Sequence, residues 1–205
     1  YVAAMGLDNS EVTGGIDAFA LGIYSVNPDA EVYVKVTNSW YDPKAEEEAA
    51  RKLLDMNCDV IAQHCDTVYP QTLAQQKGVY SIGYNSDMSK EAPEACLCSV
   101  IWNWSAYYTS AVQSVIDGTW DGSNYYGGMN ENLVSITPIA DFAAAATKEK
   151  VNMAKQQILS GKNGVFDGVI ETNTGAEVGT AGKTLEDSVI TSGINWYFKT
   201  VKVIE

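Results

Sequence analysis

Short apolar segments that fit β-strands alternate with segments that fit amphipathic helices along residues 1–87. In 31–36, valines alternate with polar residues, as in a half-buried strand. Asp42 followed by Pro43 is a cap residue with proline at the first helical position, so a helix starts there and runs to about Met56. The expected strands are 1–6, 31–36, 59–64 and 79–84, and the expected helices are 13–24, 43–56 and 70–77. This alternation predicts an α/β fold with a doubly wound parallel sheet.

The patterns after residue 87 are weaker. Residues 99–117 have apolar positions at helical spacing, so a helix is expected there after a short strand. The segment 117–128, DGTWDGSNYYGG, combines glycines with aromatic residues and is expected to be a loop. Further strands are expected at 133–139, 164–166 and 195–203, the last two joined by a glycine-rich loop, and a helix at 148–159.

The charge of the chain argues against nucleic acid as a partner. The 205 residues carry a net charge of -13 at neutral pH, and Arg51 is the only arginine. Phosphates are bound by clustered lysine and arginine, which this sequence lacks, and an arginine clamp on an anionic substrate is disfavoured too. No apolar run reaches the ~18 residues that span a bilayer. The chain opens at Tyr1 with a strand-like stretch, not a signal peptide, so this sequence alone does not indicate export.

Nothing in the sequence supports catalysis or a metal centre. The spacing of Cys58, Cys65, Cys96 and Cys98 matches neither a zinc ribbon nor a redox CxxC motif. We expect them to be small buried apolar residues, and leave their pairing open except that Cys58 and Cys65, at the two ends of one strand, are too far apart to bridge. Adjacent strand residues point to opposite faces, so His64 and Cys65 do not form a nucleophile–base pair. Walker, GxGxxG and HExxH motifs are absent.

Polar and aromatic residues follow the predicted strands where each strand ends. Trp40 lies just beyond the second strand, His64 and Asp66 end or follow the third, and Asn85 and Asp87 follow the fourth. Ligands of open parallel sheets bind beyond the carboxyl ends of the strands, so we expect these residues to share one rim. A flat aromatic beside hydrogen-bonding groups suits a planar, polar heterocycle. The alternatives are packing for Trp40, a structural role for His64, and helix capping for Asp66 and Asp87.

Longer stretches of the sequence resemble a known family. NSWYDPKAEEEAARKLLDMNCDVIAQHCD, GVYSIGYNSDMSKEAPEACLCSVIWNWSAYYTSAVQSVIDGTW and the closing INWY are similar to the basic membrane protein (BMP) family of substrate-binding lipoproteins of ABC importers. The resemblance covers most of the chain and is strongest over residues 14–120. The elements QH-x-D, GYxSDM and IWNW are similar to the subgroup associated with adenine or related purines.

The resemblance implies a type I periplasmic-binding fold, in which two α/β lobes flank a ligand cleft. It implies that residues 1–98 form most of the second lobe. Residues 99–118 would recross the hinge and supply a helix that packs on the first lobe, and 119–205 would mainly return to the second lobe. First-lobe sequence, with the family's lipid-bearing cysteine, would then lie upstream of Tyr1.

The resemblance also implies ligand positions. Trp40 matches the aromatic residue that stacks on the base, commonly phenylalanine. Asn85 and Asp87 match an acidic pair that hydrogen-bonds the ligand, although Asn85 departs from the usual aspartate. Trp102 stands where typical nucleoside binders have a lysine that holds the ribose, which favours a bare nucleobase packed against Trp102. His64 and Asp66 are expected to line the same rim.

The function implied is capture of a purine, a nucleobase such as adenine or a nucleoside, by an extracytoplasmic protein that delivers it to an ABC permease. Such a protein is periplasmic or lipid-anchored at the cell membrane, is not an enzyme and needs no cofactor. Two alternatives stay open: a ligand-sensing transcription regulator built on a BMP domain, and a Rossmann-like hydrolase. An upstream DNA-binding segment would indicate the first, and turnover of a bound purine the second.

Overall fold

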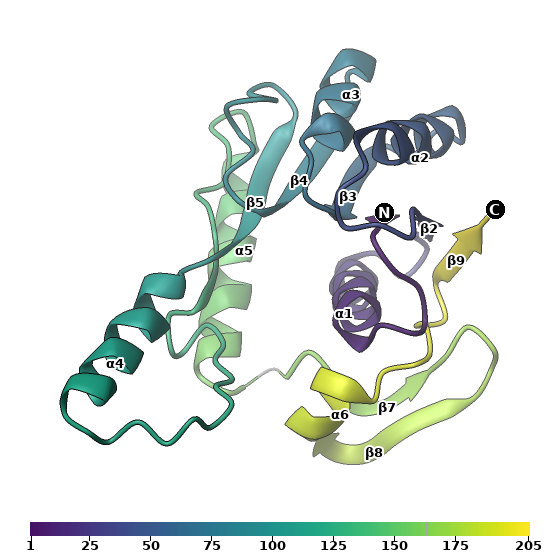
Figure 1. Ribbon diagram of the computed structural model, residues 1–205. Helices are drawn as coiled ribbons and strands as arrows, with labels where there is room; N and C mark the ends of the chain where they lie inside the picture. The colour runs from purple at the N-terminus through teal and green to yellow at the C-terminus, as the bar shows by residue number, and fades with distance from the viewer. Residues whose placement is uncertain (163) are drawn as a thin grey trace.

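Figure 1 shows the computed structural model of the chain, which describes residues 1–162 and 164–205. Within these residues a seven-stranded sheet has the order β6-β5-β4-β3-β1-β2-β9. Its strands are β1 (Val2–Ala3), β2 (Val32–Val36), β3 (Val60–His64), β4 (Tyr80–Asn85), β5 (Cys96–Trp102), β6 (Val134–Ile136) and β9 (Val201–Ile204). Neighbouring strands are parallel, except for the antiparallel pair β5 and β6. The predicted α/β fold with a mostly parallel sheet is confirmed.

Helices cover both faces of the sheet (Figure 1). Helix α1 (Ser10–Val26) lies on one face, and α2 (Pro43–Asp55) and α3 (Tyr69–Lys77) lie on the other. From β1 the chain passes through α1 to β2 on one side, and α2 then returns it past β1 to β3 on the other. Because crossovers between parallel strands are right-handed, connections that run in opposite directions place their helices on opposite faces. The sheet is therefore doubly wound.

Local capping explains where these helices begin and end. The Asn9 side chain accepts a hydrogen bond from the Val12 N–H at the start of α1. At the start of α2 the Asp42 carboxylate accepts from the N–H groups of Lys44 and Ala45, as the Asp-Pro pair predicts. Helix α3 ends at Gly78, whose φ of 70° is a left-handed conformation that glycine adopts without strain.

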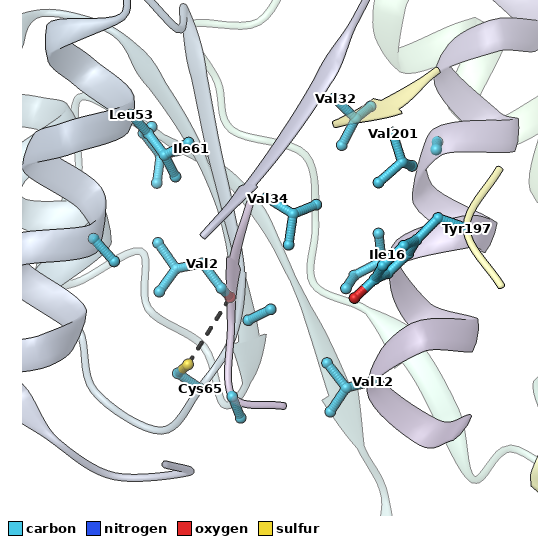
Figure 2. Close-up of a cluster of buried hydrophobic side chains, with 14 of the residues drawn as sticks. Val2, Val12, Ile16, Val32, Val34, Leu53, Ile61, Cys65, Tyr197 and Val201 are labelled. Carbon is cyan, nitrogen blue, oxygen red and sulfur yellow. Dashed lines mark hydrogen bonds between the residues drawn. The ribbon is translucent and has the colours of Figure 1, made fainter. Parts of the chain in front are cut away.

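The main core joins the sheet to α1 and α2 (Figure 2). Val2 and Val34 from the sheet, Ile16 from α1 and Leu53 from α2 are all 0% exposed. Cys65 lies in the same core with its Sγ directed at the Val2 carbonyl oxygen, 3.9 Å away (Figure 2). Burial of this kind stabilises by roughly 1.5–3 kcal/mol per large apolar side chain, so the core fixes β1 between its two neighbours.

The cysteines are all free thiols. Cys65 and Cys96 are buried, and Cys58 and Cys98 are half-buried. The two buried thiols fit the expectation of small apolar residues, and no pair bridges.

Several predicted boundaries after residue 87 are wrong. Residues 99–102 continue β5, because 99–101 pair with β4 and Trp102 pairs with β6, and helix α4 (Trp104–Ile116) begins only after them. The strand expected at 164–166 is β7 (Asp167–Glu171), and the one expected at 195–203 is strand only in β9. The glycine-rich loop expected between them contains β8 (Glu177–Thr184), which pairs with β7, and α6 (Asp187–Ser192). Most β8 side chains are exposed, so it lacks the apolar alternation that marks a buried strand.

Helix α4 extends away from the main body (Figure 1), and the later helix α5 spans Ala145–Leu159. Neither has a buried residue. On α4 the exposed apolar side chains are Trp104, Tyr108, Val112, Val115 and Ile116. The spacing of the first three is that of one helix face, and within the described part of the chain nothing covers it. Among the described helices none is long and apolar enough to cross a membrane.

Candidate functional site

The candidate site lies at the centre of the sheet, where the connections that follow β1 and β3 run to opposite faces. In β1, Ala3 pairs with His64 of β3 on one side and with Val36 of β2 on the other. The chain leaves β1 towards α1 and leaves β3 towards α3, which lie on opposite faces. In doubly wound sheets, ligands usually bind outside the carboxyl ends of the strands at such a reversal of direction.

Trp40, His64 and Tyr84 form an aromatic cluster at this end of the sheet. The His64 ring lies 4.2 Å from the Tyr84 ring at 49°, and 5.8 Å from the Trp40 ring at 71°. Tilted and edge-to-face arrangements of this kind are favoured between aromatic rings. A Cβ built at Gly15 of α1 would lie only 2.8 Å from Nδ1 of His64. Glycine at that position therefore gives the imidazole room against the helix.

His64 is a neutral, incompletely paired histidine. Its side chain is 6% exposed, and burial lowers its pKa to about 4. Its Nδ1 lies 3.4 Å from the Tyr1 hydroxyl, whereas Nε2 has no hydrogen-bond partner among the residues that the structure describes. A buried nitrogen without a partner is unfavourable, and Nε2 can donate or accept according to the tautomer.

We expect burial of His64 to make the protein less stable as the pH falls from 6.5 to 4. His64 binds a proton near pH 6.5 in the unfolded chain but only near pH 4 in the folded protein. The contribution of neutral His64 to stability is therefore complete above pH 6.5 and is lost as the pH falls towards 4. Asp17, whose pKa burial raises to about 7, acts in the opposite sense. The measurement is therefore a comparison of urea unfolding at pH 7 and pH 5 in the wild type and in His64→Gln.

The wild type should lose more stability than His64→Gln between those two pH values. Because the chain has a single histidine, an NMR titration reports the His64 pKa directly. A measured pKa near 6.5 would contradict the buried, neutral state.

Asp66 and Asn85 are linked across the rim. The Asn85 Nδ2 donates to Asp66 Oδ1 over 3.3 Å, and the Asp66 N–H donates to the Trp40 carbonyl oxygen over 2.9 Å. Both side chains are exposed, and Asp66 does not cap α3, whose first turn has no side-chain cap. The pair presents a carboxylate acceptor and an amide next to the aromatic cluster.

Trp102 ends β5 beside this pair. Its neighbour Ile101 pairs with Asn85, because β4 and β5 are parallel and end at the same edge. The Trp102 ring stacks on Trp104 with centroids 5.6 Å apart and planes at 21°. Burial raises the pKa of the nearby Tyr84 to about 12. Trp102 thus lies at the same edge of the sheet as Asn85, stacked on Trp104.

Asp87 has different surroundings. Its Oδ1 accepts a hydrogen bond from the Ser89 N–H over 3.0 Å, and hydrogen bonding by the Ser89 side chain and N–H holds the pKa of Asp87 below the ordinary value. It lines a cavity of about 430 Å³ with Cys96, Cys98 and Thr137. Asp87 is exposed and caps a local turn. The helix cap that the sequence left open is wrong here, because turns and not a helix follow Asp87. The structure joins Trp40 to His64 and Asp66 to Asn85, but records no contact of Asp87 with them.

Tyr84 and Gly15 also belong to the cluster around His64, although neither was expected there from the sequence. Strand residues two apart point to the same face, so Tyr84 lies on the same face of β4 as Ile82. This alternation could have predicted the direction of the Tyr84 side chain. The role of Gly15 depends on how α1 packs against His64, which no local pattern reveals.

The arrangement is suited to binding and not to covalent chemistry. Burial raises the pKa of Cys65 to about 12, and its Sγ lies 3.9 Å from the Thr37 hydroxyl, away from the His64 face of the strand. A thiol in that state is a poor nucleophile. The described residues contain no group of three or more side chains placed to hold a metal ion. The residues brought together here present aromatic faces and hydrogen-bonding groups.

Comparison with known proteins identifies the class that this fold and site define. The model of the Bmp family, described as ABC transporter substrate-binding protein PnrA-like, matches residues 1–165. The chain belongs to this family. It is 37% identical over 187 residues to a purine-binding protein of Brucella abortus, covering 91% of this chain and 53% of the relative.

A second relative is named for a different ligand. The chain is 36% identical over 168 residues to a protein of Haloferax volcanii named as an ABC transporter glucose-binding protein, covering 82% of this chain and 42% of that protein. The chain thus spans about half the length of the relatives it matches.

Solved structures share the fold. A solute-binding protein of an ABC transporter system from Conexibacter woesei matches with a TM-score of 0.60 and 20% identity, covering 79% of this chain and 54% of that one. A transcriptional activator of the comK gene from Bacillus halodurans matches with a TM-score of 0.65 and 17% identity, covering 79% of this chain and 65% of that one. At these identities the likeness concerns the fold alone.

Proposed function

We propose that this chain is the ligand-gripping part of an extracytoplasmic binding protein that captures a purine for an ABC permease. The observation that carries the proposal is the aromatic cluster of Trp40, His64 and Tyr84 at the diverging strand ends, next to the hydrogen-bonding pair Asp66 and Asn85. A planar heterocycle with polar edges matches both parts of that site. The purine-binding relative from Brucella abortus supports the same choice.

In this proposal Trp40 stacks on the base, and Asp66 and Asn85 bind its polar edge together with Nε2 of His64. Trp102 closes the side where a ribose would otherwise lie. Asp87 contributes through the turn that it caps, or directly once a ligand is bound. A bare nucleobase such as adenine is favoured over a nucleoside, because the aromatic Trp102 offers the ribose hydroxyls no charged donor.

We also propose that the cleft is completed by a first lobe outside this chain, with residues 1–98 and 119–205 mainly in the second lobe. The uncovered face of α4, with Trp104, Tyr108 and Val112, supports this arrangement, since an exposed apolar helix face favours association. A lipid anchor upstream would hold such a protein at the outer side of the membrane.

We expect the isolated 205-residue chain to bind adenine far more weakly than the two-lobed protein, and to self-associate through α4. Calorimetry gives the affinities, and analytical ultracentrifugation gives the association state. A Tyr108→Ser, Val112→Ser variant should reduce association. Tight adenine binding by a monomeric isolated chain would contradict the two-lobed arrangement.

Identification of a copurified ligand tests the function itself. Native mass spectrometry of the natural protein, followed by denaturation and analysis of what is released, should detect a purine. Release of a hexose would favour the ligand named for the Haloferax volcanii relative. Conversion of the released purine to another compound on incubation would indicate an enzyme.

A further inference from the structure

Glu46 is a carboxylate buried without a cation. It lies in the first turn of α2 and is 0% exposed, and none of the ion pairs among the described residues includes it. Burial raises its pKa. A buried charge is unfavourable unless hydrogen bonds satisfy it, so its presence needs an explanation.

Three donors satisfy this carboxylate, and they come from two different loops. Oε1 accepts from the Asp42 N–H over 3.2 Å. Oε2 accepts from the Thr67 N–H over 3.2 Å and from the Thr67 hydroxyl over 2.6 Å. Asp42 belongs to the loop that carries Trp40, and Thr67 directly follows Asp66. Glu46 thus joins the two loops that hold an aromatic and a polar member of the candidate site.

Helix capping alone does not account for Glu46. The Asp42 carboxylate already accepts from the N–H groups of Lys44 and Ala45 at the start of α2. The bonds of Glu46 to Thr67 reach a loop 21 residues further along the chain. There the backbone bond from the Asp66 N–H to the Trp40 carbonyl oxygen, 2.9 Å long, makes the second link between the same loops.

We infer that Glu46 is a positioning residue for ligand binding: it fixes the Trp40 loop against the Asp66 loop without touching the ligand. The identity of the ligand in this inference rests on the proposed function. The claim that Glu46 holds the two loops together does not, because it rests on the hydrogen bonds alone. A carboxylate is required because only an acceptor-only group can satisfy donors from both loops at once.

The test replaces Glu46 with glutamine in the natural, full-length protein, labelled with fluorotryptophan. The amide keeps the shape but turns an N–H₂ group towards at least one donor, which disrupts one of the links. We expect the fluorine NMR signal of Trp40, assigned with Trp40→Phe, to shift or broaden. The signal of Trp196, which packs edge-on against Phe166, should stay unchanged. Adenine affinity should fall about tenfold, because binding must then also order the Trp40 loop.

Matched variants separate positioning from general damage. Glu48→Gln makes the same chemical change at an exposed position of the same helix and should change neither signal nor affinity. Thr67→Val removes the hydroxyl donor and should reproduce the effect of Glu46→Gln, whereas Thr67→Ser should retain wild-type behaviour. If Glu46→Gln fails to fold, Thr67→Val decides the question.

An unchanged Trp40 signal and unchanged affinity in folded Thr67→Val would overturn the inference. A wild type that binds no purine would overturn the proposed function instead, because the Trp40 signal tests positioning without any ligand.

Discussion

Replacement of Trp40 with alanine should lower the affinity for adenine by more than tenfold. Aromatic stacking is worth roughly 1–3 kcal/mol per base, and each 1.4 kcal/mol is about a factor of ten in affinity. Trp40 is half-buried and meets the His64 ring edge-on, so its removal also leaves that imidazole less shielded. Isothermal titration of the natural protein measures the change.

Two controls accompany the Trp40 variant. Trp40→Phe keeps an aromatic face and should retain most of the affinity. Trp120→Ala removes an exposed tryptophan from the loop after α4 and should leave binding unchanged. Wild-type affinity in a folded Trp40→Ala protein would show that Trp40 packs without stacking on the ligand.

Replacement of Gly83 with alanine should destabilise the protein by about 1–3 kcal/mol, the range for overpacking a core. A Cβ at this position of β4 would lie 2.3 Å from the Ser99 Oγ and 3.0 Å from the Met88 Cβ. Ser99 is 0% exposed and its Oγ accepts the Met88 N–H over 3.1 Å, so it cannot turn aside without losing that bond. This explains the glycine that opens the GYxSDM element.

Gly22 provides the matched control. It lies inside α1, and a Cβ there would meet nothing within 4 Å. Gly22→Ala should therefore stabilise by about 0.5–1 kcal/mol, because glycine loses more conformational freedom in a helix than alanine. Urea unfolding of both variants gives the comparison. Equal stability of Gly83→Ala and the wild type would contradict the close packing of β4 against β5.

Strands β1 to β4 could be predicted because their signals are local. Alternating valines mark β2, and the Asp-Pro pair marks the start of α2. The hairpin of β7 and β8 could not be predicted in this way. Its strand β8 is mostly exposed and glycine-containing, and it is a strand because it pairs with β7. Pairing partners are a property of the tertiary structure.

The positions of residues along the rim could be predicted wherever the end of the preceding strand could be predicted. Trp40, His64, Asp66 and Asn85 follow from strand positions alone, whereas Asp87 is placed differently by the turn that it caps. Glu46 was hidden because it stands in the sequence AEEEAA, which reads as the solvated side of a helix. Its burial depends on the loop after β3 folding over it.

The central claim is that this site binds a purine, and calorimetric titration of the natural protein with adenine, adenosine, guanosine and glucose tests it most directly. The account predicts that adenine binds and that adenosine binds less tightly, with no heat from glucose. If adenosine bound more tightly than adenine, the preference for a bare nucleobase would be wrong within the same family. Binding of glucose without binding of any purine would contradict the account.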